Sequence, residues 1–382
     1  MSDWTLSDAE RAEMTELLAS LIRIPSPDPP GNEAEIATFL VDWLRARGFA
    51  VEIDEFEPER INVLARIKSS GSKPGLVFSA HMDTMPIGDS TWKHDPFGAE
   101  TKNGRLYGRG AGDMKSGLAA MAAAALKIKT AGLPLTGDLI LAFSAGESSS
   151  CLGAKRMVEA GSLTGAGTLL VSEPSSLGLI VAETGALWLR VTATGKPGHA
   201  SAGGGDNAVL KLIDFLHAVR DNPFKGHTHP LLGPASLAIN TISGGTAVNL
   251  TADHAEATLD IRSVPGMTTP DILAELEGIA AGRVNFHIID DKPPVVTETT
   301  DPFIAICRGA VEKVTGVRPE PSGAGYFSDS STLVPALDLP RVIIGPGKLG
   351  MSGQGDEWVG LDDLSTAAAI YGEIAADLLA PD

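Results

Sequence analysis

Residues 75–84, with the sequence GLVFSAHMDT, decide the fold. The segment is almost continuously apolar up to Ala80, which is typical of a strand that is buried on both faces at the centre of a parallel sheet. Two polar residues, His81 and Asp83, stand at its carboxyl end. Ligand sites in open α/β sheets form at the carboxyl ends of the strands, so we expect functional residues at this end.

The segments around this strand alternate between helical and extended patterns. Helical spacing of apolar residues predicts helices over 7–23 and roughly 32–48, and an Ala-rich helix covers 113–132. Two further apolar runs, DLILAFSAGE at 138–147 and GTLLVSEP at 167–174, are predicted as buried strands. This alternation predicts an α/β layer with a mostly parallel central sheet.

From about residue 184 the pattern changes. The segments ALWLRVTATG, SLAINTISGG and EATLDIRS alternate apolar and polar residues, which predicts an antiparallel sheet with one solvated face. Helices are expected in this region at 207–220 and 270–281, and in the last part of the chain at 301–315 and 362–379. We therefore predict a catalytic domain built from 1–183 and 294–382, interrupted by an inserted α+β domain at 184–293.

Composition restricts the possible partners and location. With 382 residues, 43% of them hydrophobic and 20% charged, the chain is long enough for two globular domains. A net charge of −18 argues against nucleic-acid binding, which requires clustered Lys and Arg. Two cysteines make no disulfide framework, and the N-terminal segment lacks the pattern of a signal peptide. We expect a cytoplasmic protein without a nucleic-acid or membrane partner.

Polar residues at the ends of the apolar strands form the candidate site. They are His81, Asp83, Asp113, Glu147 and Glu173. Any single acidic residue of this kind is commonly a helix cap or a solvated loop residue, and Asp113 could merely cap the helix that follows it. An imidazole and several carboxylates at one edge of a sheet instead indicate a divalent cation, with zinc favoured and manganese or cobalt compatible.

An ordered series of motifs resembles a known family. SAHMDTMP, NGRLYGRGAGDMKSG, FSAGES, SEP, GKPGHAS and NLTADHAEATLDIR match the M20 metallohydrolases in order and approximate spacing over nearly the whole chain. The family includes aminoacylases, acetylornithine deacetylases, succinyl-diaminopimelate desuccinylases and carboxypeptidases. The resemblance implies a zinc-peptidase-like catalytic domain, an inserted dimerisation (lid) domain that makes a homodimer, and hydrolysis of an amide C–N bond. The implied substrate is an N-acyl amino acid or a small peptide-like compound that bears a carboxylate.

The resemblance also implies roles for the residues at the strand ends. His81, Asp113 and Glu173 correspond to ligands of one metal ion, and Asp113 normally bridges to a second ion. Asp83 would orient the His81 ring. Glu147 would be the general base that takes a proton from the attacking water.

Further residues would contact the substrate by the same resemblance. His199, in the GKPGHAS segment of the inserted domain, would reach the partner subunit's site and stabilise the tetrahedral oxyanion. Asn249 and Arg262 would bind the substrate carboxylate. Gly325 in the segment GAGYFSDSS would offer a backbone N–H group, with Asp329 in support.

Two positions depart from the family pattern. The family has a second acidic residue after the GE of SAGES, where this chain has Ser148, and a histidine four residues before the Glu of DEW, where it has Gly353. Both are ligands of the second metal in the family, so we predict a site with one metal. Gln354 could serve as a displaced neutral ligand, or Lys348 could replace the lost positive charge.

Two other functions stay open. Loss of one metal could accompany a non-hydrolytic, lyase-type reaction at a C–N bond, or the chain could be a non-catalytic descendant that binds a ligand. Retention of Glu147 argues against the second alternative, because a proton carrier has no use without chemistry. A serine nucleophile in GESSS is disfavoured because the segment lacks the GxSxG elbow.

Overall fold

The computed structural model describes residues 4–203 and 205–381, which divide into two compact units. The first contains the residues up to Val181, Thr297–Ser322 and those from Ser328 onward, and the second contains Ala182–Val296 and Gly323–Phe327. The insert expected at 184–293 lies inside the second unit. Residues 323–327, which the sequence analysis assigns to the first domain, belong to the second unit because Phe327 packs at 6.0 Å from the Trp188 ring.

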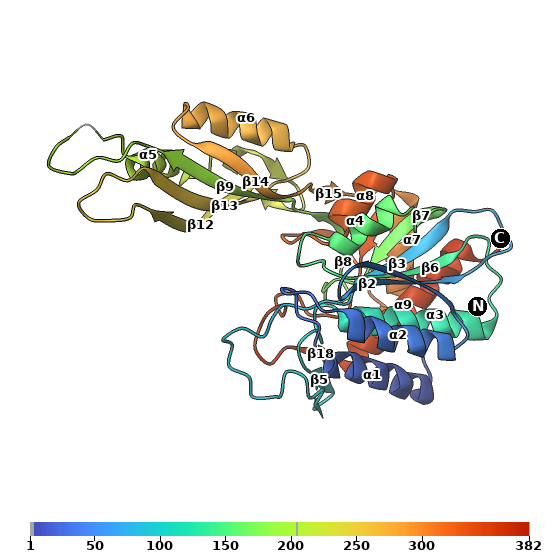
Figure 1. The fold of residues 1–382 in the computed structure, drawn as a ribbon. Helices are drawn as coiled ribbons and strands as arrows, with labels where there is room; N and C mark the ends of the chain where they lie inside the picture. Colours follow the sequence, from blue (N-terminus) through green and yellow to red (C-terminus); the bar gives the residue numbers. More distant parts are fainter. Residues whose placement is uncertain (1–3, 204, 382) are drawn as a thin grey trace. The chain divides into compact units, whose positions relative to one another are not determined.

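The first unit is built on a mixed sheet with a parallel centre (Figure 1). The parallel strands β6, β3, β7 and β17 lie side by side, and antiparallel strands flank them on both sides. The sheet order is β1 (Ala50–Glu57), β2 (Arg60–Ile67), β6 (Leu139–Ser144), β3 (Gly75–His81), β7 (Ala166–Val171), β17 (Arg341–Ile343), β8 (Leu179–Glu183) and β15 (Val295–Val296), with β16 (Pro321–Ala324) paired to β8. This is the predicted α/β architecture.

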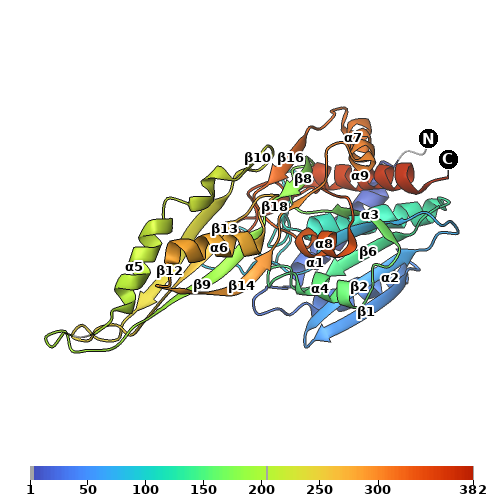
Figure 2. The same ribbon diagram turned by 90° about the horizontal axis from the view of Figure 1, so that it is seen from above.

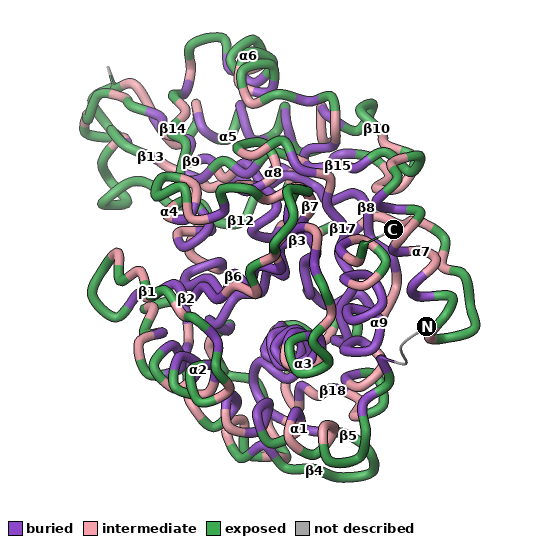
Figure 3. The backbone as a smooth tube through the Cα atoms, turned by 90° about the vertical axis from the view of Figure 1, so that its right-hand side faces the viewer, coloured by how far each residue is buried: buried purple, intermediate pink, exposed green. Residues whose placement is uncertain are grey.

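Helices cover both faces of this sheet. One face carries α1 (Asp8–Arg23), α2 (Ala34–Ala46), α3 (Lys115–Ala131), α7 (Pro302–Thr315) and α9 (Leu361–Leu379), and the other carries α4 (Leu152–Glu159) and α8 (Ser330–Leu337). The sequence analysis did not predict α4 and α8, which have only eight residues each. Helix α3 packs against β3 and α9 and is mostly buried (Figure 3), as its Ala-rich sequence allows.

A small antiparallel sheet lies outside the main one. It consists of β4 (Thr101–Lys102), β5 (Arg105–Tyr107) and β18 (Trp358–Gly360). Pairing of β18 with β5 holds Glu357 beside the loop that leads to α3, since the Gly108 N–H donates to the Glu357 carbonyl at 2.9 Å. Two distant parts of the chain meet in this way next to Asp113.

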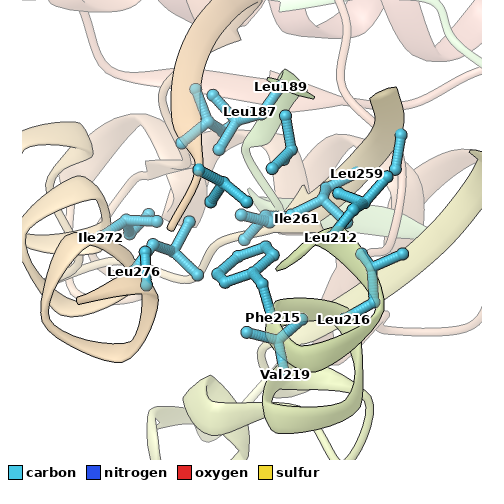
Figure 4. Close-up of a cluster of buried hydrophobic side chains, with 14 of the residues drawn as sticks. Leu187, Leu189, Leu212, Phe215, Leu216, Val219, Leu259, Ile261, Ile272 and Leu276 are labelled. Atoms are coloured by element: carbon cyan, nitrogen blue, oxygen red, sulfur yellow. The ribbon is translucent and has the colours of Figure 1, made fainter. Parts of the chain in front are cut away.

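The second unit is a separate α+β module (Figure 2). Its antiparallel sheet has the order β12 (Ser236–Gly244), β13 (His254–Arg262), β9 (Ala186–Thr194) and β14 (Asn285–Lys292). Helices α5 (Ala208–Val219) and α6 (Thr269–Ala280) cover one face and enclose a core that includes Leu189, Phe215 and Leu276 (Figure 4). A short helix η1 (Pro223–Gly226) and a hairpin of β10 (Thr228–His229) and β11 (Gly233–Pro234) complete the unit.

Among the helices of the described residues, none combines the length and the apolar character needed to cross a bilayer.

Candidate metal centre

Three side chains converge at the carboxyl edge of the parallel strands. His81 is the last residue of β3, and Glu173 follows the end of β7, the neighbouring parallel strand. Asp113 comes from the turn before α3. The His81 Nε2 atom lies 3.3 Å from Asp113 Oδ1 and 3.5 Å from Glu173 Oε1. The order of the strands therefore places the three predicted metal ligands together.

The chemistry of this set fits a divalent cation. One imidazole nitrogen and two carboxylates are common zinc ligands, and their ligand atoms all lie within 4.8 Å of one another. Burial raises the pKa of Glu173 well above its ordinary value, and the charge of Asp113 raises it further. A cation between these carboxylates would relieve both effects.

The tautomer of His81 follows from its contact with Asp83. The ring Nδ1 lies 2.9 Å from the backbone carbonyl oxygen of Asp83, which can only accept a hydrogen bond. Nδ1 therefore carries the proton, and Nε2 remains as the metal ligand. The Asp83 carboxylate is 3.6 Å from Nδ1 and instead accepts the N–H groups of Glu147 at 3.0 Å and Ser148 at 3.1 Å. Asp83 thus orients His81 through its main chain and holds the Glu147 turn through its side chain.

Glu147 lies in the turn that follows β6 and is 8% exposed. Burial raises the pKa of its carboxyl well above the ordinary value, although the charge of His81 opposes this effect. The charge of Asp329 also raises the pKa of Glu147. The Asp329 carboxylate accepts a hydrogen bond from Ser144 Oγ at the end of β6. Burial raises the pKa of Asp329 to about 6. The first unit therefore contains a second, protonatable carboxylate beside the three ligands.

The other predicted substrate contacts lie in the second unit. His199 and Leu250 form an isolated β-bridge, and the Ala200 N–H donates to the Asn249 carbonyl at 3.0 Å, so His199 and Asn249 lie on adjacent segments. Arg262, near the end of β13, donates to Asp260 Oδ2 at 2.9 Å. Gly325 is exposed in the segment Gly323–Phe327. Within this unit, Asn249 is the predicted residue that lies next to His199.

Glu357 supports the Asp113 loop, a role that sequence reasoning missed. Its Oε1 atom accepts the backbone N–H groups of Gly110 at 3.1 Å, Gly112 at 2.8 Å and Asp113 at 3.0 Å. Its Oε2 atom accepts from Arg109 NH1 at 2.6 Å. The motif DEW contains this residue, but a motif alone does not tell which amides a carboxylate will bind. Sequence reasoning also missed three residues near the Glu147 turn. Glu33 and Asp28 accept hydrogen bonds from this turn, and Arg60 pairs with both of them. No pattern in the sequence singles them out.

Comparisons with known proteins show the family to which the chain belongs. The family model described as peptidase family M20/M25/M40 matches residues 77–377. The chain is 30% identical to a succinyl-diaminopimelate desuccinylase of Methylobacterium radiotolerans over 94% of this chain and 95% of that protein. It is 29% identical to an acetylornithine deacetylase of Vibrio campbellii over 92% of this chain and 93% of that protein.

A solved structure shows the same fold. An M20 family metallo-carboxypeptidase of Sulfolobus solfataricus superposes with a TM-score of 0.81 at 18% identity, covering 97% of this chain and 99% of that one. Because the family model spans most of the chain, and because full-length relatives reach 30% identity, this protein belongs to the M20/M25/M40 peptidase family and is a metallohydrolase acting on C–N bonds.

Proposed function

We propose that this protein hydrolyses the amide bond of an N-acyl amino acid or small peptide-like compound with a single divalent ion, zinc in the first instance. His81, Asp113 and Glu173 would hold the ion. Relatives that act as a desuccinylase and a deacetylase support the substrate class. The observation that carries the proposal is the convergence of the three ligands beside Glu147 at one edge of the sheet.

The residues of the chain would divide the chemistry as follows. A bound ion supplies Lewis-acid polarisation of the substrate carbonyl and of the attacking water. Glu147 takes the proton of that water and returns it to the leaving amine, and burial raises the pKa of its carboxyl, which favours uptake of that proton. Asp83 keeps the Glu147 backbone in place. Asp329 and Ser144 hold the end of β6.

Residues of the second unit would contact the substrate. We propose that His199 donates a hydrogen bond to the oxyanion in the partner subunit's site and that Asn249, Arg262 and the N–H of Gly325 bind the substrate carboxylate region. Arg262 already donates one N–H to Asp260, and its guanidinium carries five donors, so it retains others for a ligand. The screen described below tests this assignment, because substrates without a carboxylate should be poor.

The single ion is proposed from the surroundings of Asp113. Its Oδ1 faces His81, while its Oδ2 accepts a hydrogen bond from Ser352 Oγ. If Asp113 bridged two ions, its Oδ2 would face the second one. The neutral hydroxyl of Ser352 lies at this oxygen instead. Gly353 has φ +72°, and among the described residues other than its two chain neighbours no heavy atom lies within 4 Å of the position its Cβ would take. This position carries no side chain in place of the family's histidine. Ser148 supplies no carboxylate.

Metal content tests the single-ion site. Wild-type protein dialysed against zinc is expected to contain one ion per chain by elemental analysis, because His81, Asp113 and Glu173 combine an imidazole with two carboxylates, whereas two members of the other acidic group among the described residues, Asp28 and Glu33, are paired with Arg60. The double variant Ser148→Glu, Gly353→His restores a carboxylate and an imidazole and is expected to bind two. Two ions per wild-type chain at full occupancy would contradict the proposal, and one ion in the double variant would show that Gln354, Lys348 or Ser352 prevents the second from binding.

The reaction itself is tested by a screen of N-acetyl and N-succinyl amino acids and dipeptides. Turnover in ¹⁸O-labelled water should place one labelled oxygen in the released acid, because hydrolysis adds the solvent oxygen to the acyl carbon. Product formation without label would indicate a lyase-type reaction. Ligand binding without turnover of any substrate would favour a non-catalytic protein.

We further propose a homodimer through the second unit. Strand β12 is an edge of the four-stranded sheet, and its Ile239 and Ile242 are 37% and 59% exposed. They pair with Leu259 and Ala257, whose side chains belong to the core under α5, so they lie on the α5 face. On α5 itself, Leu210 and Ile213 are 57% and 46% exposed. This apolar face beside an unpaired strand edge suits a second copy of the chain.

Light scattering after size exclusion checks the dimer. Ile242→Lys places a charge on the apolar face and is expected to halve the measured mass. Ile288→Lys, on the opposite edge strand β14 and 40% exposed, is the matched control and should leave the dimer intact. A monomeric wild type would contradict the dimer, and a dimer that survives the first change and not the second would place the interface elsewhere.

A cytoplasmic location is proposed as well. The chain contains only two cysteines, too few for the disulfide framework of many extracellular domains. Cell fractionation would check it, and recovery in a secreted fraction would contradict it.

A further inference from the structure

We infer that Asp28, Glu33 and Arg60 are positioning residues for Glu147: together with Asp83 they hold the turn 146–149 that carries this proton carrier. The inference rests on the proposed role of Glu147 in hydrolysis. It concerns residues outside the metal ligands and outside the motifs of the family resemblance.

Four successive residues of this turn are held by three carboxylates. The Gly146 N–H donates to Glu33 Oε1 at 3.0 Å. The N–H groups of Glu147 and Ser148 donate to the two oxygens of Asp83, and Ser149 Oγ donates to Asp28 Oδ1 at 2.6 Å. Each carboxylate therefore fixes a different point of the turn.

The residue before the turn is held in the same manner. The Ala145 N–H donates to Asn62 Oδ1 at 3.1 Å, and Asn62 Nδ2 donates to the Gly153 carbonyl at 3.0 Å. Asn62 is fully buried on β2, close in sequence to Arg60, which begins that strand. Strand β2 thus supplies both the amide that holds the entry to the turn and the guanidinium described next.

Arg60 pairs with two of the carboxylates. Its NH2 atom lies 2.9 Å from Asp28 Oδ1, and its NH1 atom lies 3.1 Å from Glu33 Oε1. Asp28 and Glu33 are fully buried, and Arg60 is 7% exposed. Buried carboxylates are costly unless they are paired and hydrogen-bonded. One carboxylate oxygen from each of Asp28, Glu33 and Asp83 lies within 4.8 Å of the others, and the guanidinium supplies a positive charge directly against two of these residues, Asp28 and Glu33.

The backbone around the guanidinium is shaped to admit it. A Cβ at Gly146 would lie 2.5 Å from Arg60 NH1, and one at Gly31 would lie 2.2 Å from Arg60 Cζ. Both glycines also have positive φ, +70° and +86°. Gly146 in the turn and Gly31 in the segment 28–33 therefore both lie against Arg60. A side chain at either glycine would displace the guanidinium.

This arrangement predicts a loss of rate without a loss of metal. Glu33→Ala removes the acceptor of the Gly146 N–H, so the Glu147 carboxylate should no longer be held at the reacting atoms. We expect kcat to fall about 10- to 100-fold. KM should change less than about threefold, because substrate binding is not touched. The zinc content should equal that of the wild type, and hydrogen exchange of the amides in 145–149 should accelerate.

Two further variants separate positioning from general stability. Glu33→Gln keeps an acceptor oxygen for Gly146 and should recover most of the lost rate. Glu373→Ala removes another buried carboxylate, 4% exposed on α9 and paired with Lys313, and should leave both kcat and the exchange of 145–149 unchanged. If Glu33→Ala does not fold, Ser149→Ala removes one of the same hydrogen bonds at the edge of the turn and should lower kcat severalfold.

The outcomes distinguish this inference from the proposed function. If the wild type hydrolyses no substrate, the proposed function fails, and hydrogen exchange alone then decides whether Glu33 holds the turn. Unchanged exchange in Glu33→Ala, equal losses in Glu33→Ala and Glu373→Ala, or a loss of bound zinc that matches the loss of rate would overturn the positioning role.

Discussion

Replacing Glu147 with Gln is expected to lower kcat by about a thousandfold, within the range that a positioned acid–base group contributes. Gln has nearly the same shape but cannot accept the proton of the attacking water. The turn that carries residue 147 is held through backbone N–H groups that the substitution leaves unchanged. Substrate KM and zinc content should therefore stay close to the wild-type values. Steady-state kinetics with elemental analysis of the same samples would measure all three quantities.

The fold should survive this change. Burial raises the pKa of Glu147, which means that ionising it in the folded protein is unfavourable, and a neutral amide avoids that cost. We expect the metal-free variant to melt at no lower temperature than the metal-free wild type. Glu373→Gln, at a buried ion pair on α9, is the matched control and should keep full activity. Full activity in Glu147→Gln would remove this residue from the mechanism.

Replacing His81 with Ala is expected to weaken zinc binding by at least about 100-fold, since loss of an outer-shell partner alone costs 10- to 100-fold. The variant loses the one nitrogen ligand of the set and leaves Asp113 and Glu173 without the group that lies between them. Turnover should fall below detection at zinc concentrations that saturate the wild type. Competition with a fluorescent chelator would measure the affinity, and activity at high added zinc would show whether the metal restores the rate.

His94→Ala provides the control for the loss of a histidine. His94 lies in the same unit, stacks on Tyr107 and contacts Glu100 Oε2 at 2.7 Å. Its removal should leave zinc affinity at the wild-type value. A His81→Ala protein that binds zinc normally would mean that the ion lies elsewhere, and the ligand assignment of Asp113 and Glu173 would fail with it.

Much of the site could be predicted because its residues follow apolar strands. His81 ends β3, Glu147 and Glu173 stand within three residues of the ends of β6 and β7, and these three strands are neighbours in the sheet. A short apolar run is a local signal, and the rule that parallel strands end at one edge turns three such runs into one site.

The supporting residues could not be predicted in this way. Glu33 and Gly146 are 113 residues apart, and Glu357 and Gly112 are 245 apart. Neither carboxylate belongs to a repeating pattern, and each looks in the sequence like a loop or helix-start residue. The resemblance implied that Asp83 orients the His81 ring, but it did not tell which group of Asp83 makes the contact. In the structure it is the backbone carbonyl, at 2.9 Å from Nδ1.

The α/β class, the alternation of the longer helices and strands, the inserted module and the identity of the residues at the strand ends were determined by the sequence alone. Apolar periodicity and turn residues are properties of short segments, so they can be recognised without knowing the fold. Tertiary structure alone decided which carboxylate holds which amide, that Arg60 pairs with Asp28 and Glu33, and that Ser352 donates to Asp113 Oδ2. Those choices depend on atoms that meet only when distant segments pack, where burial makes an unpaired charge costly and selects the pairing.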